Sequence, residues 1–318
     1  MDRYHQKPVV CVVGPTASGK SALAQLIALE LDGEIVSADS MQIYRGMDIG
    51  TGKVPESQRV VNHYGLDLAD PGEPWSAALF QEYARRCFDE IEAKGKWPIL
   101  CGGTGFYVRA AIDDYDFPKG EQVDNELRDT LNAVAEHEGA HVLWERLREI
   151  DPESAAIIPE NDVKRVVRAF ELLDEGLSYA EQKEKLAQIG QYKPAIFIGL
   201  AVDPDTLRQR IRDRVDEMVA EGLVEEVESL LARGFREGVT APQAIGYKEI
   251  VQALDEGRNL EEAFEEIKVA TCRYAKRQRT WFRKDKRVHW IDATALDIDS
   301  MLKESLEIIS NMSKADEA

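Results

Sequence analysis

The sequence predicts an α/β fold in which a parallel sheet is flanked by helices and an all-helical insertion interrupts the chain. In residues 1–112, short apolar runs rich in β-branched side chains alternate with amphipathic helical segments, the order that builds a parallel sheet. In residues 113–193 only helical patterns occur. In residues 194–318 strand and helix alternate again, and the helix before the last strand is strongly basic. We therefore expect a sheet domain in two parts with a helical insertion domain between them.

The first strand and the first helix enclose a glycine-rich loop. Residues 8–13 form an apolar run typical of a buried strand, and residues 21–31 carry apolar side chains at helical spacing. Between them the chain reads Gly14, Pro15, Thr16, Ala17, Ser18, Gly19, Lys20 and Ser21. This fits the pattern of Gly, four residues, Gly-Lys and Ser or Thr that defines a phosphate-binding loop, or P-loop. The order of strand, loop and helix is the context that the motif requires, so the expected sheet is of the P-loop NTPase type.

The P-loop predicts a site for a diphosphate or triphosphate group. Backbone N–H groups of the loop and the N-terminus of the helix converge on one anion. Lys20 brings a positive charge to the terminal phosphates, and the Ser21 hydroxyl can bind Mg²⁺, the expected cofactor. The alternative is a glycine-rich turn without a ligand. The fixed positions of the motif coincide by chance in roughly one such chain in a hundred.

The other elements of the first part follow in the expected alternation. The sequence predicts a strand over 34–38, a glycine-rich loop over 44–55, a strand over 62–68, a helix over 76–94 and a strand over 98–101. The second strand ends at Asp39, which we expect to face the phosphate site because ligands gather at the carboxyl ends of strands. Its alternative is a turn or N-cap residue.

A metal-holding Asp is missing where P-loop hydrolases usually carry one, at the end of an apolar strand. The strand over 98–101 runs instead into a second glycine turn, 102–105, that opens a helix. Asp39 is the best carboxylate that is left. This favours a transferase that holds a leaving diphosphate over a motor or GTPase.

The insertion and the second part complete the element order. The insertion contains helical patterns over 127–135, 141–150 and 163–173, with Asp151-Pro152 and Ile158-Pro159 as breaks. The third of these helices has a basic face made of Lys164, Arg165 and Arg168. The second part predicts a strand over 195–200, a helical stretch over 203–233, a helix entered by the turn 241–248, a helix over 261–283, a strand over 288–291 and a helix over 298–312.

Net charge and cysteine content limit the partners and the cellular compartment that the protein can have. The net charge of −19 argues against a nucleic-acid partner for the protein as a whole. Residues 271–290, however, carry eight Lys and Arg against the single Asp285, which indicates either a solvated helix face or a contact with a polyanion. Four cysteines without ligand-like spacing, and no apolar run of membrane-spanning length or signal peptide, favour a cytoplasmic protein without a membrane partner. We expect a monomer.

Five motifs in order resemble those of the tRNA dimethylallyltransferase (tRNA isopentenyltransferase) family, of bacterial type. They are the P-loop, DSMQIYRGMDIGT from Asp39, GGTGFY from Gly102, AIGYKE from Ala244 and AKRQRTWFR from Ala275. The resemblance runs from the first strand to about Trp290. The departures are small, since Gly52 stands where the family often has Ala and Phe106 where it often has Leu.

The resemblance implies transfer of a dimethylallyl group from dimethylallyl diphosphate to the exocyclic amine of the adenine just 3′ of the tRNA anticodon. The P-loop, Lys20 and Mg²⁺ would stabilise the charge that grows on the leaving diphosphate. By the same resemblance Asp39 is the general base, Thr104 lies beside the reacting centre and Arg214 is a second cation on the diphosphate. The target base must be flipped out of its stack to react.

The resemblance also implies contacts with the anticodon stem-loop. Residues expected near the flipped base are Asp39, Ser40, Met41, Gln42, Thr104, Gly246, Tyr247 and Lys248. Residues expected to flank the stem-loop are Arg128, Lys164, Arg165, Arg168, Arg273 and Arg277. Tyr247 has an alternative as a core residue at a helix start.

Three other functions share parts of this pattern. A small-molecule kinase that uses ATP shares the loop, the sheet and a helical insert, but it has no use for the basic stretch. An RNA-binding GTPase-like switch should carry a base-reading Asn/Thr-Lys-x-Asp motif, and none is found. An adenylate isopentenyltransferase, acting on free nucleotides, would not need the basic face of the insertion.

Overall fold

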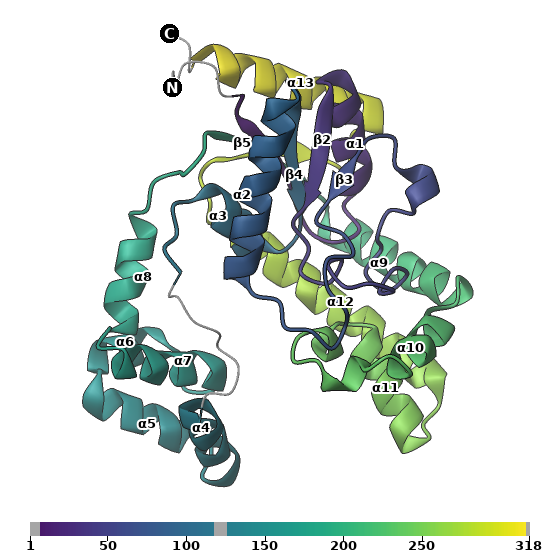
Figure 1. Cartoon of the computed structure of the whole chain (residues 1–318). Helices are drawn as coiled ribbons and strands as arrows, with labels where there is room; N and C mark the ends of the chain where they lie inside the picture. Colours follow the sequence, from purple (N-terminus) through teal and green to yellow (C-terminus); the bar gives the residue numbers. More distant parts are fainter. Residues whose placement is uncertain (1–6, 118–125, 316–318) are drawn as a thin grey trace. The chain divides into compact units, whose positions relative to one another are not determined.

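A computed structural model of the chain describes residues 7–117 and 126–315 (Figure 1). It divides into two units. The core unit comprises residues 1–113 and 191–318, and the helical unit comprises residues 114–190. Residues 1–6, 118–125 and 316–318 lie outside the described residues. No helix in the described ranges has the length and apolar character needed to cross a membrane.

The core unit is built on a parallel sheet of six strands in the order β3-β2-β4-β1-β5-β6 (Figure 1), which confirms the predicted fold class. The strands are β1 (Val9–Val13), β2 (Gly33–Ser37), β3 (His63–Tyr64), β4 (Trp97–Gly102), β5 (Ala195–Ala201) and β6 (Val288–Asp292). β3 is shorter than the predicted strand over 62–68. Gly65 turns the chain at φ 79° and lies against the Ser37 carbonyl, and Asp67 adopts φ 55°.

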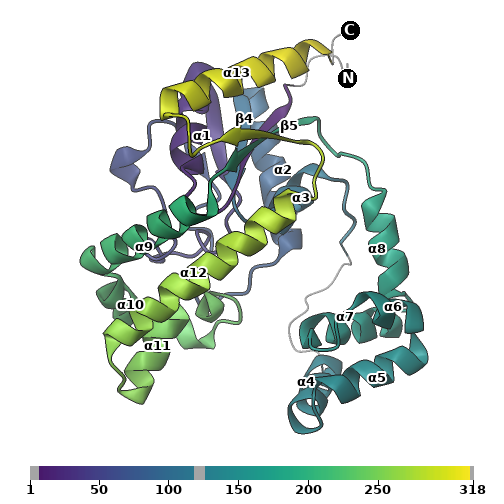
Figure 2. The ribbon, with the colours of Figure 1, turned by 180° about the vertical axis from the view of Figure 1, so that it is seen from behind.

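Helices cover both faces of the sheet, which explains why its strands are continuous apolar runs. One face packs on α2 (Ala77–Ala93), α3 (Gly105–Ile112) and α12 (Leu260–Phe282). The other face packs on α1 (Lys20–Glu30), α9 (Pro204–Ala220) and α13 (Ile298–Ala315) (Figure 2). α10 (Leu223–Leu231) and α11 (Tyr247–Glu256) lie beside α9 and α12 (Figure 2). Short 3₁₀ turns occur at Glu56–Gln58, Phe235–Glu237 and Ala241–Gln243.

The helical stretch predicted over 203–233 is two helices and not one. α9 ends at Ala220, and Gly222 adopts a left-handed φ of 103° before α10 begins at Leu223. A helix cannot continue through that conformation, and glycine adopts it without strain. The two helices can therefore pack on different neighbours.

The helical unit contains α4 (Glu126–His137), α5 (Ala140–Ile150), α6 (Pro152–Ile157), α7 (Val163–Asp174) and α8 (Tyr179–Ala187) around a small apolar core. The predicted break at Asp151-Pro152 is also the start of α6, because the Asp151 carboxylate accepts from the Ser154 N–H and caps the helix. Neither α6 nor α8 was predicted from the sequence.

Several of the predicted basic contacts have partners inside the helical unit. Arg128 Nε donates to Glu171 Oε1 at 2.6 Å, and Arg168 donates to Glu171 Oε2 at 3.0 Å. Arg165 pairs with Asp162 at 3.0 Å, and Lys164 is exposed. Arg128 and Arg168 therefore neutralise the buried Glu171, which the sequence analysis did not foresee.

Replacing Glu171 by Gln is expected to destabilise the helical unit by about 2 kcal/mol, because two charged hydrogen bonds lose their carboxylate. Burial raises the pKa of Glu171, but the two arginines outweigh it and hold the pKa below its ordinary value. This contribution is therefore complete above the unfolded pKa of about 4.3 and is lost as pH falls through the folded pKa. Hydrogen exchange of α4 and α7 peptides would measure it, with the exposed Glu181→Gln on α8 as control. Equal protection in both variants would contradict the assignment.

Candidate active site

The P-loop joins β1 to α1 at the carboxyl end of the sheet. Gly19 has φ 90° and stands directly before α1, so the loop needs a residue without a side chain there. Lys20 opens the helix, and its Nζ donates to the Pro15 carbonyl at 3.3 Å, which folds the side chain back over the loop. Burial lowers the pKa of Lys20, while Asp39 and Cys101 oppose that change. The loop thus presents a cation and the N-terminus of a helix at one place.

The segments that follow β2 and β4 meet beside this loop. The Thr104 hydroxyl oxygen accepts from the Ser40 N–H at 3.1 Å, and the Thr104 N–H donates to the Ala38 carbonyl at 3.2 Å. The Asp39 carboxylate accepts from the Met41 N–H at 3.0 Å. A side chain at Gly102 would collide with the Ala38 carbonyl, so glycine permits this approach. Thr104 therefore fixes the turn that carries Asp39.

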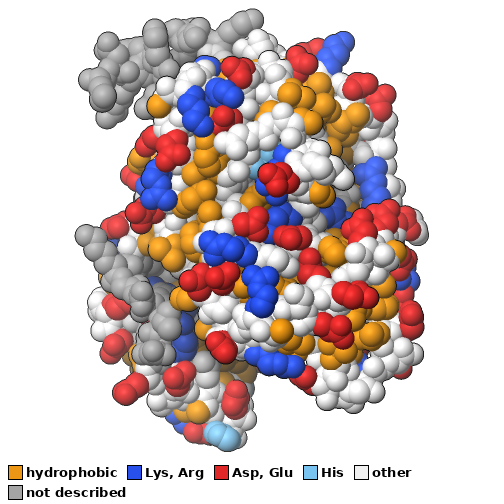
Figure 3. Space-filling view, turned by 45° about the vertical axis from the view of Figure 1, so that its right-hand side comes forward, with side chains coloured by type: hydrophobic (Ala, Val, Ile, Leu, Met, Phe, Trp, Pro, Cys, Tyr) orange, Lys and Arg blue, Asp and Glu red, His pale blue; other side chains and the backbone are white. Residues whose placement is uncertain are grey.

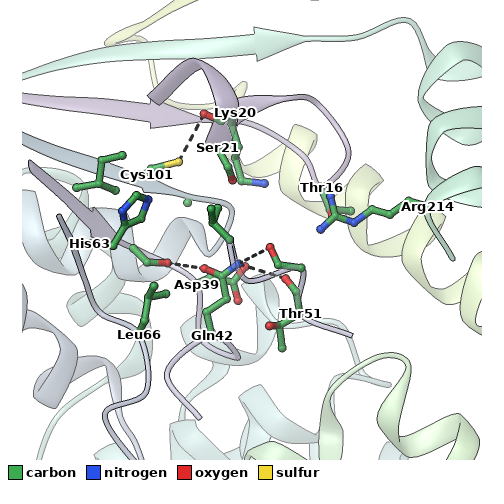
Figure 4. Close-up of a pocket in the computed structure, with 15 residues that line it drawn as sticks. Thr16, Lys20, Ser21, Asp39, Gln42, Thr51, His63, Leu66, Cys101 and Arg214 are labelled. Carbon is green, nitrogen blue, oxygen red and sulfur yellow. Dashed lines mark hydrogen bonds between the residues drawn. The ribbon is translucent and has the colours of Figure 1, made fainter. Parts of the chain in front are cut away.

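A small cavity of about 50 Å³ lies between these segments (Figure 4). Lys20 and Ser21 line one side of it, Asp39 and Gln42 line another, and Arg214 reaches in from α9 (Figure 4). Its lining is completed by Thr16, Ile35, Ser37, Thr51, Gly52, Val54, His63, Leu66, Cys101 and Gly102. Two cations and the P-loop thus face one space.

Arg214 is held at this cavity by the glycine-rich loop of residues 44–55. A Cβ at Gly52 would collide with the guanidinium, so the Arg214 side chain rests directly on the Gly52 backbone. Burial lowers the pKa of Arg214, and the nearby Asp39 opposes this. An arginine remains charged in such a setting.

A larger cavity of about 390 Å³ adjoins the small one. The two share Thr16, Asp39, Thr51 and Arg214 in their linings. The larger one has apolar walls from α9 and α12, such as Ile211 and Ile267, and cationic side chains. Besides the shared Arg214, these cationic side chains are Lys248, Arg273 and Arg277. Asp39 therefore lies where a cationic diphosphate-sized space meets a space of nucleotide size.

The cationic wall is a local feature of an acidic protein. The net charge is −19, and acidic side chains are scattered over the face drawn in Figure 3. Within the predicted basic stretch, Arg273 and Arg277 line the larger cavity, whereas Arg287 pairs with Asp113 and Asp285. Only part of the basic stretch is thus available to a ligand.

The other residues predicted to contact nucleotides line the larger cavity, line the small cavity or lie in the core. Ser40, Met41, Gly246 and Lys248 line the larger cavity. Gln42 lines the small cavity, where its Nε2 donates to the Thr51 and Gly52 carbonyls at 3.2 and 3.3 Å. Tyr247 lines neither cavity. It is fully buried and donates to Glu226 Oε1 at 2.6 Å, so its alternative as a core residue describes it correctly.

Two side chains of α12 belong to the site although the sequence analysis did not select them. Gln278 is 4 % exposed, and its Oε1 accepts from the P-loop Thr16 N–H at 2.9 Å while its Nε2 donates to the Gly103 carbonyl at 3.0 Å. Tyr274 lines the larger cavity, and burial, with a smaller effect of Asp39, raises its pKa to about 12. Tyr274 and Gln278 are four residues apart, a spacing that places them on one helix face. Gln278 lies within the motif that starts at Ala275, and this position is the signal that could have identified the pair.

Replacing Gln278 by Ala is expected to weaken binding of a diphosphate at the P-loop by about tenfold, because two hydrogen bonds that tie the loop to the second glycine turn are lost. Calorimetric titration with inorganic pyrophosphate and Mg²⁺ would measure this. The exposed Gln252→Ala on α11 is a matched control. Unchanged pyrophosphate affinity in a folded Gln278→Ala protein would show that the P-loop keeps its shape without the two hydrogen bonds of Gln278.

The chain is similar to known proteins along most of its length. Residues 42–285 match a family model described as IPP transferase. The tRNA dimethylallyltransferase of Geobacillus thermodenitrificans is 47 % identical over 288 residues, which cover 90 % of each chain. The crystal structure of the full-length tRNA isopentenylpyrophosphate transferase of Bacillus halodurans matches with a TM-score of 0.71 at 39 % identity, over 98 % of this chain and 100 % of that one. A eukaryotic dimethylallyltransferase acting on tRNA matches with a TM-score of 0.81 at 28 % identity, over 98 % of this chain and 80 % of that one.

Proposed function

Because the chain belongs to the IPP transferase family, we propose that it is a tRNA dimethylallyltransferase. It transfers the dimethylallyl group of dimethylallyl diphosphate to the exocyclic amine of the adenine that follows the anticodon of tRNA, and it releases diphosphate. The observation that best supports this reaction is that two cavities meet at Asp39. One is cationic and adjoins the P-loop, and the other is large enough for a nucleotide.

The cationic cavity suits the prenyl donor. As the bond between the allylic carbon and oxygen breaks, the electron pair leaves with the diphosphate, where negative charge grows. Lys20, Arg214 and the N-terminus of α1 face the position of that charge. Groups fixed before the reaction stabilise such charge without reorganisation, typically by several kcal/mol.

The larger cavity suits the adenine. Its amine is a weak nucleophile because the lone pair is delocalised into the ring. Asp39 is placed between the cavities, where it accepts a proton from the amine as nitrogen bonds to the allylic carbon. Thr104 holds the Asp39 turn through the Ser40 N–H. Bond formation, bond breaking and proton transfer thus balance without another reactant.

Mg²⁺ fits the donor side of the site. The Ser21 hydroxyl is a hard oxygen donor on the wall of the small cavity, and such a donor together with phosphate oxygens suits Mg²⁺. Residues 7–117 and 126–315 hold no group of three or more His, Cys, Asp or Glu side chains able to bind a metal. Most ligands would therefore come from the diphosphate and water. When bound, the ion neutralises negative charge on the diphosphate.

The cationic residues favour tRNA over a free nucleotide as acceptor. Lys248, Arg273 and Arg277 line the adenine side of the site, and Lys164 and Arg165 are exposed on α7 of the helical unit. A free nucleotide would not need the basic face of the helical unit. We propose that these residues contact the phosphates of the anticodon stem-loop, while bases splayed from the loop supply specificity. The residues that line the two cavities come from one core unit, so one copy of the chain supplies both cavities, and we propose that the protein is a monomer. Its relatives are tRNA dimethylallyltransferases, so we also propose a cytoplasmic location.

A transfer assay with three acceptors tests this function. The purified protein, Mg²⁺ and radiolabelled dimethylallyl diphosphate would be incubated in parallel with unmodified tRNA whose anticodon is followed by adenine, with AMP and with ATP. The proposal predicts label in tRNA alone. Label in AMP or ATP would indicate an adenylate isopentenyltransferase, and phosphoryl transfer from ATP without prenyl transfer would indicate a kinase.

A further inference from the structure

The mechanism above uses two motifs of the sequence only in part. The first is the second half of the glycine-rich loop, Asp48–Lys53, and the second is the segment Ala244–Lys248 that enters α11. In the structure both are tied to one carboxylate, Glu226 of α10. No sequence pattern singles out Glu226, because it lies outside every motif.

The Glu226 carboxylate is saturated by hydrogen bonds. Its Oε2 accepts from the N–H groups of Asp48 at 3.0 Å and Ile49 at 2.8 Å. Its Oε1 accepts from the Gly50 N–H at 3.2 Å and from the Tyr247 hydroxyl at 2.6 Å. Convergent donors of this kind require an acceptor without hydrogens, which a carboxylate supplies and an amide supplies only in part.

Tyr247 adds a steric contact to this arrangement. Its ring is fully buried, and a Cβ at Gly50 would come within 2.5 Å of ring atom Cε2. Glycine at position 50 therefore lets the turn lie flat on the ring. Ring and carboxylate together fix one side of the turn formed by residues 50–52.

The opposite side of the turn is also fixed. Gln42 Nε2 donates to the carbonyls of Thr51 and Gly52, and the buried Lys53 donates to the Tyr44 carbonyl at 3.0 Å. What the turn presents outward is Thr51, which lines both cavities, and the Gly52 backbone, on which the Arg214 guanidinium rests. The path from Glu226 to Arg214 is thus a chain of direct contacts.

We propose that Glu226 and Tyr247 are positioning residues that act through the turn 50–52 to hold the Arg214 guanidinium at the diphosphate. This inference rests on the proposed function, since it takes the small cavity as the diphosphate site. It assigns Tyr247 and the loop motif to the donor side of the reaction and not to RNA contact. It also separates two kinds of residue, those that touch the diphosphate and those that set their position.

A double-mutant cycle on pyrophosphate affinity tests the proposal. Inorganic pyrophosphate with Mg²⁺ is titrated into the wild type, Glu226→Gln, Arg214→Ala and the double variant. Glu226→Gln is expected to weaken binding about tenfold in the wild-type background, because a charge-assisted contact from Arg214 is displaced. In the Arg214→Ala background it should weaken binding less than about twofold, because residues that act as one unit are not additive.

The outcomes separate this inference from the proposed function. Equal losses in both backgrounds, or no loss in either, would overturn the inference while leaving the diphosphate site intact. Failure of the wild type to bind pyrophosphate would overturn the diphosphate site and the inference with it. The exposed Glu228→Gln on the same helix is the control and should bind like the wild type. If Glu226→Gln does not fold, Tyr247→Phe, which removes one hydroxyl, enters the same cycle with the same criterion of non-additivity.

Discussion

Replacing Asp39 by Asn is expected to slow prenyl transfer about 10³-fold under single-turnover conditions, because the amide cannot take the proton of the adenine amine. The amide oxygen can still accept from the Met41 N–H, which the carboxylate does at 3.0 Å, so the turn should keep its shape. Affinities for pyrophosphate and for an anticodon stem-loop should change by less than about threefold.

The control for this substitution is Asp213→Asn, which alters an exposed carboxylate on α9. It should react at the wild-type rate. Near-normal transfer by Asp39→Asn would mean that another group, or water, removes the proton. A large loss of pyrophosphate affinity would mean that Asp39 acts mainly on the donor side.

Replacing Lys20 by Met is expected to lower the transfer rate by about 10²–10³-fold and to weaken pyrophosphate binding, because a cation that meets the developing diphosphate charge is lost. Met keeps the length of the stem, so the loop loses charge more than volume. Stopped-flow or quench-flow transfer and calorimetry would measure the two effects.

Lys303→Met removes an exposed lysine on α13 and serves as the matched control. Affinity for the anticodon stem-loop should be unchanged in Lys20→Met, because Lys20 lines the small cavity and not the larger one. Loss of RNA affinity without loss of pyrophosphate affinity would mean that Lys20 contacts the RNA and not the diphosphate.

Features set by local sequence could be predicted. Gly19-Lys20 at the start of α1, the Ser76 cap of α2 and the buried strands each follow from neighbouring residues and a simple period. The resemblance to a family then supplied a role for Asp39. Its position at the junction of the two cavities, however, came only from the structure.

Features set by distant contacts could not be predicted. The hydrogen bond between Thr16 and Gln278 joins residues that are 262 positions apart in the sequence. No local pattern near either residue predicts this contact. Tyr247 lies in a motif from which a contact with RNA was predicted, but its hydrogen-bond partner Glu226 lies outside every motif. α8 was missed because its nine residues are mostly polar, with Tyr179 as a contact to the small apolar core. Such elements depend on tertiary packing, which overrides weak local preference.

The two substrates are expected to meet at Asp39, one from each cavity. A crystal structure with dimethylallyl thiodiphosphate, Mg²⁺ and an anticodon stem-loop would show whether they do. We expect the thiodiphosphate to lie against Lys20 and Arg214, and the exocyclic amine of the flipped adenine to lie within about 2.6–3.2 Å of the Asp39 carboxylate. A diphosphate bound in the larger cavity, or an amine that faces a group other than Asp39, would contradict this expectation.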